Sequence, residues 1–244
     1  EKARTEISGT DLLLCVGGDG TILRSAQVVI GTEIPIVGIN LGRLGFMTEL
    51  TADEVTSKLP SLLSGEGWID ERAMLEVTFS IAEQEKRFSA LNDVVVARGA
   101  VARVVNVAVA IDGATLTTYI ADGVITATAT GSTGYSLSAG GPILHPRAKE
   151  FLLLPIVPHL CPPYPLVLPA NTSVELCVRT PFAATLSIDG HTNLSVPDGT
   201  KFTVRESPYR TRFLRIHPES AFFSTLEQKL RGRKYAEPSG KSQN

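Results

Sequence analysis

The chain has 244 residues and a formal net charge of −2, enough length for one large or two modest domains. Its lysines and arginines are scattered rather than gathered in a stripe, so the charge pattern of a nucleic-acid-binding protein is missing. Prolines interrupt the longest apolar stretch, 151–169, which excludes it as a transmembrane helix. Three cysteines far apart, Cys15, Cys161 and Cys177, fit reduced core residues of a cytoplasmic protein rather than a disulfide or zinc framework.

The first structural signal is an apolar strand over 11–16 that leads through Gly17-Gly18-Asp19-Gly20 into a helix over 21–30. We expect this strand to be buried. A glycine turn between a strand and a helix brings backbone N–H groups close to a bound phosphate, with the positive end of the helix dipole behind them. Asp19 is the only charged side chain in the turn, and a carboxylate beside phosphate indicates a catalytic or Mg²⁺-organising role. The alternative is an ordinary surface turn, because glycine and aspartate are common turn residues.

The texture of the sequence changes near Gly67 and predicts two domains. Residues 1–67 read as an α/β nucleotide-binding domain with few strands, 11–16 and 34–39, so we expect a further strand and helix to precede this chain in its parent protein. Residues 68–216 read as an all-β sandwich of short strands, among them 69–81, 87–97, 104–111 and 172–178. A helix over 218–231 should pack outside the sandwich, against the N-terminal domain, and 232–244 should be a flexible tail.

A second glycine motif, 126–145, combines small residues with many hydroxyls. Its hydroxyl and N–H groups could bind phosphate and ribose, and Tyr135 offers a ring on which a base could stack. We expect a short helix over 132–139, ended by Gly140 in the left-handed conformation. The alternative is a low-complexity surface loop.

Asn92 and Asp93 open a run of apolar β-branched residues. Taken alone, they fit the end of a strand. Their side chains also have the acceptors and donors that ribose hydroxyls and an adenine edge require.

Together these motifs resemble the NAD kinases. The resemblance covers roughly residues 10–216 and rests on 17–21, 92–93 and 130–142, with support from 40–46, 121–123 and 187–190. The glycine–aspartate turn alone also resembles lipid kinases and some phosphofructokinases, whereas the 130–142 motif is much more specific. The implied fold is an α/β N-terminal domain plus an all-β sandwich C-terminal domain, with a nucleotide site in the cleft between them.

The implied enzyme is a kinase that transfers phosphate from ATP or polyphosphate to the 2′-hydroxyl of the adenosine ribose of NAD, giving NADP. By resemblance Asp19 activates that hydroxyl, and Asn92 and Asp93 hold parts of the dinucleotide. Further residues implied to bind the substrates are Gly18, Gly20, Thr21, Phe46, Asp122, Thr130, Thr133, Gly134, Tyr135 and Ser138. Homodimers or homotetramers in the cytoplasm are implied as well.

The chemistry of the residues agrees with this reading. The chain lacks a P-loop lysine motif, so the glycine turn, the helix dipole and Mg²⁺ carried by the phosphate donor must balance the phosphate charge. The four histidines show no metal-ligand spacing, so no metal site made by the protein alone is expected. Asp19 is the best candidate for the base, Asp122 is the next, more suited to orienting a group, and Arg43 could reach a phosphate.

Some residues depart from the family pattern, namely Ala129 where proline is commoner, Gly134 where alanine is commoner, and the loop 159–165. These changes affect the shape of the pocket more than the type of reaction. Two rival functions remain open, a lipid kinase and a non-catalytic dinucleotide sensor. A lipid kinase needs a path for an acyl chain, and a sensor has no reason to keep Asp19 beside phosphate.

Overall fold

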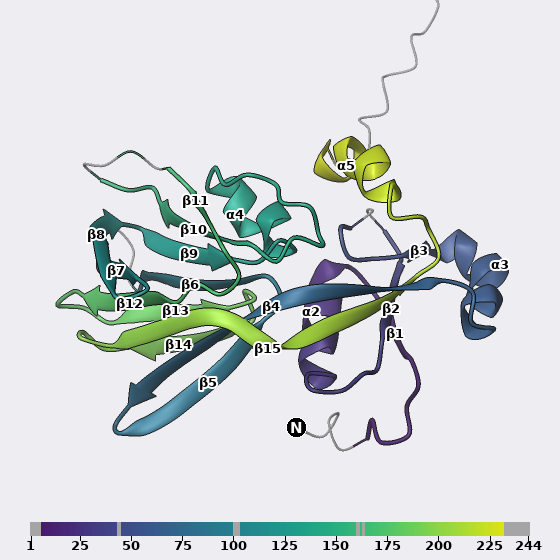
Figure 1. Cartoon of the computed structure of the whole chain (residues 1–244), viewed down its shortest axis with the longest axis horizontal. Helices are drawn as coiled ribbons and strands as arrows, with labels where there is room; N and C mark the ends of the chain where they lie inside the picture. Colours follow the sequence, from purple (N-terminus) through teal and green to yellow (C-terminus); the bar gives the residue numbers. More distant parts are fainter. Residues whose placement is uncertain (1–5, 43–44, 100–102, 160–161, 163, 232–244) are drawn as a thin grey trace, which may run out of the picture. The chain divides into compact units, whose positions relative to one another are not determined.

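A computed structural model describes residues 6–42, 45–99, 103–159, 162 and 164–231 (Figure 1). The chain forms two compact units, Glu1–Asp70 with Arg212–Asn244, and Glu71–Thr211. The predicted domains, 1–67 and 68–216, differ from these units by a few residues at each junction. We call the two parts the first unit and the second unit.

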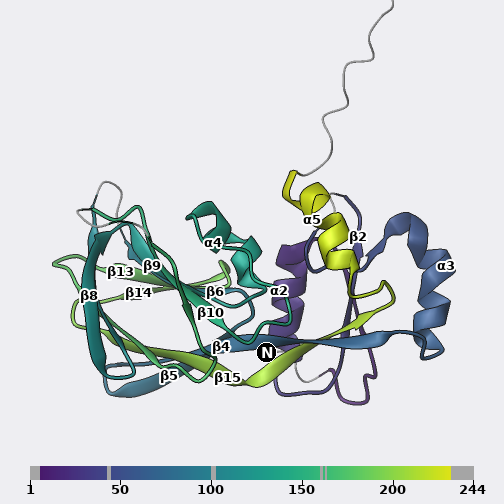
Figure 2. The ribbon, with the colours of Figure 1, turned by 45° about the horizontal axis from the view of Figure 1, so that its top comes forward.

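The first unit is a small parallel sheet with helices on both faces. Its elements are β1 (Leu13–Val16), α2 (Asp19–Val28), β2 (Ile36–Asn40), β3 (Leu50–Thr51), α3 (Ala52–Leu63), the end of β15 (Lys201–Arg215) and α5 (Ala221–Arg231). Strand β2 pairs in parallel with β1, β3 and the end of β15. Figure 2 shows α2 and α3 on opposite sides of this sheet.

The alternation of side chains along β2 explains the two covered faces. Val37 and Ile39 belong to an apolar cluster with Leu62 of α3. Between them, Gly38 lies against Ile22 of α2, so closely that a Cβ at Gly38 would collide with the Ile22 side chain. This close approach of helix to strand sets the position of the turn that precedes α2.

Strand β1 is shorter and more exposed than the apolar run 11–16 predicts. Cys15 is buried, but Leu14 and Val16 are 42 % and 55 % exposed. Strand β1 stands at one end of the strand order, and α3 packs mainly on β2 and β3. The expectation of a fully buried strand was therefore wrong. Helix α2 begins two residues before the predicted start because Gly18 already serves as its N-cap.

The second unit is a sandwich of two sheets, which confirms the predicted fold class. The further strands are β4 (Trp68–Ile81), β5 (Gln84–Ala90), β6 (Asp93–Arg98), β7 (Val105–Ile111), β8 (Ala114–Ala121), β9 (Gly123–Ala127), β10 (Phe151–Ile156), β11 (Leu166–Leu168), β12 (Val174–Arg179), β13 (Ala184–Ile188) and β14 (Thr192–Val196). One sheet has the order β11-β10-β9-β6-β13-β14, and in the other β15 pairs with β4 and β12, which lead to β5 and to β7-β8. Every neighbouring pair in the first of these sheets is antiparallel.

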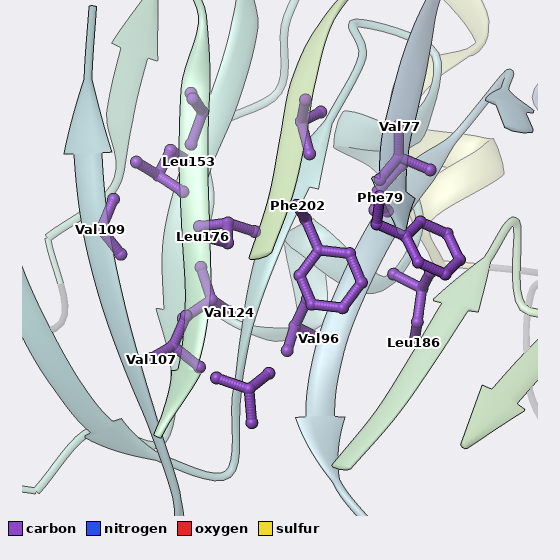
Figure 3. Close-up of a cluster of buried hydrophobic side chains, with 14 of the residues drawn as sticks. Val77, Phe79, Val96, Val107, Val109, Val124, Leu153, Leu176, Leu186 and Phe202 are labelled. Carbon is purple, nitrogen blue, oxygen red and sulfur yellow. The ribbon is translucent and has the colours of Figure 1, made fainter. Parts of the chain in front are cut away.

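The inner faces of the two sheets meet in one apolar core (Figure 3). Phe202 of one sheet tilts against Phe79 with the ring centroids 5.2 Å apart, and Val96 and Leu186 come from the other sheet. Because neighbouring residues of a strand point to opposite faces, Val95 lies in a separate cluster on the outer face. Ala139 and Leu144, both from the second glycine motif, pack on that outer cluster.

The predicted single strand over 87–97 is wrong. The chain leaves β5 at Ala90 and enters β6 at Asp93, and the two strands belong to different sheets. The reason is local, because the N–H groups of Leu91 and Asn92 turn away from any ladder and bind the carboxylate of Asp189.

Smaller differences concern the helices and the cysteines. The helix predicted over 132–139 is divided at Gly134 into a 3₁₀ turn, η1 (Gly131–Thr133), and α4 (Tyr135–Ser138). Gly140 has the expected positive φ, +90°. Cys15 and Cys177 are free thiols, whereas Cys161, Arg43 and the tail 232–244 lie outside the described residues. In the described part of the chain no helix is both long and apolar enough to cross a membrane.

Candidate functional site

The glycine turn in the first unit joins the end of β1 to α2. The N–H of Gly17 donates to the carbonyl of Ile39 at 2.8 Å, and its φ of +153° and the closeness of Thr21 leave no room for a side chain. Gly18 and Gly20 are different, because a Cβ at either position would have no other segment of the described residues within 4 Å. The fold therefore requires Gly17, while Gly18 and Gly20 keep the backbone at the start of α2 open to a ligand.

Asp19 opens α2, and its carboxylate is held from outside the helix. Oδ2 accepts the N–H of Phe46 at 2.8 Å, and Oδ1 accepts the N–H of Met47 at 3.0 Å. Gly45 lies so close that any Cβ there would collide with this carboxylate. Each carboxylate oxygen has a further acceptor position beyond the one that its N–H donor uses. The side chain is thus fixed in orientation and still able to accept a hydroxyl proton.

The other predicted residues of the first unit surround this carboxylate. Thr21 lies half-buried in the first turn of α2, and Phe46 is half-buried beside Asp19. The ammonium of Lys229, on α5, lies 5.8 Å from the centre of the Phe46 ring. This ammonium therefore lies over the side chain of the residue whose N–H binds Asp19.

In the second unit, Asp189 holds the segment that carries Asn92 and Asp93. Its Oδ2 accepts the N–H of Leu91 at 3.0 Å, while Oδ1 accepts those of Asn92 at 2.6 Å and Asp93 at 3.2 Å. Asp189 has φ +50°, and its own N–H donates to the carbonyl of Asp93 at 3.0 Å. These bonds replace the ladder contacts that the break between β5 and β6 leaves out.

The second glycine motif packs directly on this segment. The N–H of Thr128 donates to the carbonyl of Asn92 at 2.9 Å, and the Thr128 hydroxyl donates to the carbonyl of Leu91. A Cβ at Gly131 would collide with the carbonyl of Asn92, so the approach of the two backbones requires glycine there. The fold thus brings together two motifs that lie far apart in the sequence.

The hydroxyls of the motif bond partly within the turn and partly to neighbouring segments. Thr130 is buried and accepts a hydrogen bond from Arg72 Nη1 at 3.2 Å, and the Thr133 hydroxyl donates to the carbonyl of Thr130 at 3.1 Å. The hydroxyl of Ser132 donates to the carbonyl of Ala129 at 2.6 Å. Ser138 and Tyr135 are exposed. Ligand binding through the Thr130 and Thr133 hydroxyls stays a prediction.

Two of the residues that depart from the family pattern, Ala129 and Gly134, lie in this turn. Ala129 is buried, with 3 % of its surface exposed. An alanine methyl at Gly134 would lie 3.3 Å from the carbonyl oxygen of Gly131 and 3.6 Å from Nδ2 of Asn92. The absence of this methyl leaves slightly more space beside Asn92.

A cavity of about 490 Å³ opens on the outer face of the β6–β13 pair. Its floor consists of the cross-strand pairs Ala97–Thr185 and Val95–Ser187, which alternate with core residues. Its lining residues are Asn92, Asp93, Val95, Ala97, Arg98, Tyr135, Thr185, Ser187, Asp189, Gly190 and Asn193. Asn92, Asp93 and Tyr135 were predicted from the sequence and meet here. Arg98, Thr185, Ser187, Asp189 and Asn193 were not on the predicted list, although 187–190 was among the stretches that resemble the family.

Asp122 stands outside the lining of this cavity. It is half-buried, and its Oδ2 lies 3.3 Å from Nη2 of Arg98, which does line the cavity. The carboxylate therefore contacts the site through an arginine, which fits an orienting group better than a base.

Asp93 and Asp189 form a buried acidic pair beside the cavity, and 6 % of each residue is exposed. Burial, and then the charge of Asp189, raise the pKa of Asp93 to about 7. Burial also raises the pKa of Asp189, while its three backbone donors and His191 act in the opposite direction. Because those donors favour the ionised form, the pair holds its proton on Asp93 near neutral pH.

No group of three or more histidine, cysteine, aspartate or glutamate side chains that could hold a metal ion occurs among the described residues. A divalent cation beside the turn 17–21 would need oxygen ligands from the substrate as well as from the protein. Asp19 is the one residue of the turn 17–21 with an anionic oxygen to offer.

Comparison with known families and proteins covers both units. The model of the ATP-NAD kinase N-terminal domain matches residues 2–67, and that of the ATP-NAD kinase C-terminal domain matches residues 91–216. An NAD kinase of Dehalococcoides mccartyi is 48 % identical over 234 residues, which is 95 % of this chain and 82 % of the relative. An NAD kinase of Chloroflexus aurantiacus is 41 % identical over 226 residues, with 92 % and 82 % covered.

Two solved structures resemble the fold at 30 % sequence identity. An NAD kinase from Archaeoglobus fulgidus in complex with ATP aligns with a TM-score of 0.80 over 93 % of this chain and 85 % of its own. Yeast NADH kinase complexed with NADH aligns with a TM-score of 0.85 over 91 % of this chain and 66 % of its own.

The acidic pair predicts a pH-dependent stability. The pKa of Asp93 is raised from 3.8 to about 7, so the folded state keeps a proton that the unfolded chain releases. The contribution of Asp93 to the free energy of unfolding therefore falls as the pH rises from about 4 to about 7, and it levels off above that. Asp93→Asn removes this fall, so the variant should gain stability relative to the wild type between about pH 5 and about pH 8.

Urea unfolding of the wild type and the variant at about pH 5 and about pH 8 measures the free energy of unfolding. The exposed Asp11→Asn serves as the control for the loss of one acidic group. If the free energies of unfolding of Asp93→Asn and the wild type differed by the same amount at both pH values, the assignment of the proton to Asp93 would be contradicted.

Proposed function

This chain belongs to the NAD kinase family, and on that premise we propose that it transfers a phosphoryl group from ATP to the 2′-hydroxyl of the adenosine ribose of NAD, with Asp19 as the base. One observation carries the assignment of the base. The carboxylate of Asp19 stands at the start of a helix, in a turn whose glycines leave the backbone open, and two backbone N–H groups fix its orientation.

Phosphoryl transfer asks the protein chiefly to align the reactants and to balance the phosphate charge. A ribose hydroxyl is a weak nucleophile at neutral pH, and a carboxylate within hydrogen-bond reach can accept its proton as the new bond to phosphorus forms. The N–H of Thr21 already donates to the carbonyl of Gly18 at 2.9 Å, whereas the N–H groups of Asp19 and Gly20 stand at the helix start, where they can donate to phosphate oxygens. Both functions come from the same turn, because Gly18 and Gly20 give the phosphates access to it.

We propose that the dinucleotide binds in the cavity on the outer face of β6 and β13. Its volume of about 490 Å³ is in the range of cofactor sites. Tyr135, 48 % exposed at its rim, offers a ring for an adenine, and Asn92 and Asp93 offer hydrogen bonds for ribose hydroxyls. Oδ1 of Asn92 is buried and finds no hydrogen-bond partner among the residues that the structure describes, which supports a ligand as its donor.

We propose Mg²⁺ as the accompanying ion, carried by the phosphate donor. When bound, it would neutralise phosphate charge. The described residues contain no cluster of ligands for it, so the donor must supply most of its oxygens, with Asp19 as the available carboxylate of the turn. Polyphosphate remains an alternative donor in this proposal, because the turn contacts phosphates through backbone groups rather than through an adenine pocket.

We propose a homodimer or homotetramer in the cytoplasm, where NAD and ATP are both available. The free thiols of Cys15 and Cys177 are compatible with a reducing compartment. Size-exclusion chromatography with light scattering would measure the oligomeric state.

The direct test is an assay of the purified protein with NAD, Mg²⁺ and either ATP or polyphosphate, in which NADP is detected by a dehydrogenase specific for it. NADP formation with ATP supports the proposal, and parallel reactions with polyphosphate and with NADH define the donor and acceptor range. Absence of NADP with every donor would reject it.

Asp19→Asn should reduce kcat by about 10²- to 10⁴-fold, because an amide cannot accept the ribose proton. NAD should still bind, since loss of a negative charge near phosphate removes repulsion. The amide keeps one acceptor oxygen, so one of the two loop N–H groups loses its partner and the melting temperature should fall. Steady-state kinetics and calorimetric titration with NAD measure the two effects.

Asp53→Asn is the matched control, because Asp53 is the first-turn aspartate of α3 in the same unit. It should leave kcat near the wild-type value. If Asp19→Asn turned NAD over at a near-wild-type rate, Asp19 would not be the base, and Asp122 would be tested next.

Tyr135→Ala should weaken NAD binding by about 1 to 3 kcal/mol, the range for a base stacked on an aromatic ring, or about 5- to 150-fold in Kd. The ring is half-exposed at the cavity, so its removal should cost little stability. Tyr209→Ala, 42 % exposed on β15, is the control. Unchanged NAD affinity in folded Tyr135→Ala would assign the tyrosine a structural role.

A further inference from the structure

Arg215, the last residue of β15, is a buried cation between two buried carboxylates. Its Nε donates to Oδ2 of Asp70 at 3.1 Å, and its Nη1 lies 3.2 Å from Oε2 of Glu49. The side chains of all three are at most 7 % exposed. The guanidinium also lies over the ring of Phe213, 4.7 Å from its centre. All these residues belong to the first unit, which contains Asp19.

The same guanidinium reaches the loop that holds Asp19. Nη1 of Arg215 donates to the carbonyl of Met47 at 2.8 Å and lies 3.5 Å from the carbonyl of Thr48. Met47 is thus held on both sides, because its N–H donates to Asp19 and its carbonyl accepts from Arg215. Fixing the carbonyl restricts the backbone dihedrals of Met47 and thereby the direction of its N–H.

Glu49 fastens the other end of this loop. Its N–H donates to the carbonyl of Gly38 in β2, and its Oε1 accepts the N–H groups of Ile216 and His217, each at 2.8 Å. Removal of the guanidinium would leave Glu49 and Asp70 as two buried carboxylates without their shared cation, and the carbonyl of Met47 without its donor. Glu49 would keep its bonds to Ile216 and His217, so we expect a local shift of the loop.

We propose that Arg215 is a positioning residue for the phosphoryl transfer, which aligns Asp19 through the loop 46–49. This inference rests on the proposed role of Asp19 as the base. A planar guanidinium can bind two carboxylates and a carbonyl at once, which an ammonium at the same position cannot do with the same geometry. Alignment matters at this scale, because a displacement of about 1 Å at a reacting group can cost about 100-fold in rate.

The experiment compares Arg215→Met and Arg215→Lys with the wild type, at a temperature well below the melting point of each, with rates normalised to the folded fraction. We expect kcat to fall about 10- to 100-fold in Arg215→Met, with the KM for NAD changed less than about threefold. Arg215→Lys should recover most of the melting temperature, because it keeps a cation between the carboxylates, but kcat should stay at least about fivefold low.

Arg205→Met is the control for the loss of an arginine from the same strand, although its side chain is 54 % exposed. Arg205 lies on the same strand and pairs with another buried carboxylate, Glu76, at 2.9 Å, but it belongs to the second unit and has no bond to the loop 46–49. It should lower the melting temperature and leave kcat unchanged.

The double variant Arg215→Met/Asp19→Asn separates alignment of the base from a general effect on the fold. If Arg215 acts through Asp19, adding Arg215→Met to Asp19→Asn should lower kcat by less than about threefold further, because Asp19 can no longer accept the proton. The proposal is overturned if folded Arg215→Met keeps kcat within about threefold of the wild type. It is also overturned if the fall in kcat of the double variant equals the product of the falls in the two single variants. Should Arg215→Met not fold, Arg215→Lys decides by the same criteria. The wild type in the same assay tests the proposed function separately. Its formation of NADP supports that function even if the Arg215 variants overturn the positioning role.

Discussion

The candidate site depends on hydrogen bonds from loop N–H groups to the carboxylates of aspartates that lie far away in the sequence. Asp19 accepts the N–H groups of Phe46 and Met47, and Asp189 accepts those of 91–93. Charge-assisted bonds of this kind are roughly twice as strong as neutral ones, and several on one carboxylate fix its orientation as well as the loop. In each unit, one aspartate therefore holds one functional segment.

Asp19 and Asp189 differ in how much of each carboxylate a ligand can reach. Asp19 is half-buried in a turn where the neighbouring glycines leave the backbone open, so its carboxylate can still meet a hydroxyl. Asp189 is almost fully buried and uses its oxygens on three N–H groups, while its neighbour Asp93 takes the proton of the pair. The same residue type thus suits the proposed base in one unit and a structural anchor in the other, because burial and the number of donors differ.

The sandwich places polar and apolar residues by simple alternation. On β13, Ala184, Leu186 and Ile188 enter the core, so Thr185 and Ser187 must face outward into the cavity. The core that stabilises the second unit and the cavity proposed for the dinucleotide are therefore on two faces of the same strands. In the glycine motif, the hydroxyls of Ser132 and Thr133 bond within their own turn, so in the proposed function the cavity would rely on Tyr135, Asn92 and the outer face of β13 for recognition.

The sequence by itself determined the local features, namely the glycine turn before α2, the short-strand texture of the second unit and the position of Asp19. These follow from periodicity and from residues such as glycine and aspartate, whose conformational preferences act over a few positions. It also supplied the family resemblance, which rests on the order and spacing of the motifs. The break between β5 and β6 was missed, because the run 87–97 is apolar enough to read as one strand and the cause of the break, Asp189, lies 97 residues from Asn92.

The tertiary structure decided which side chains meet. Arg215 and the carbonyl of Met47 are 168 residues apart in the sequence, and no local pattern indicates that they bond. The structure likewise decided that the hydroxyls of Thr133 and Ser132 bond within their own turn and that Thr185 and Ser187 line the cavity. Hydrogen bonds depend on distance and direction in space, and only the packing of the strands and helices brings such distant donors and acceptors together.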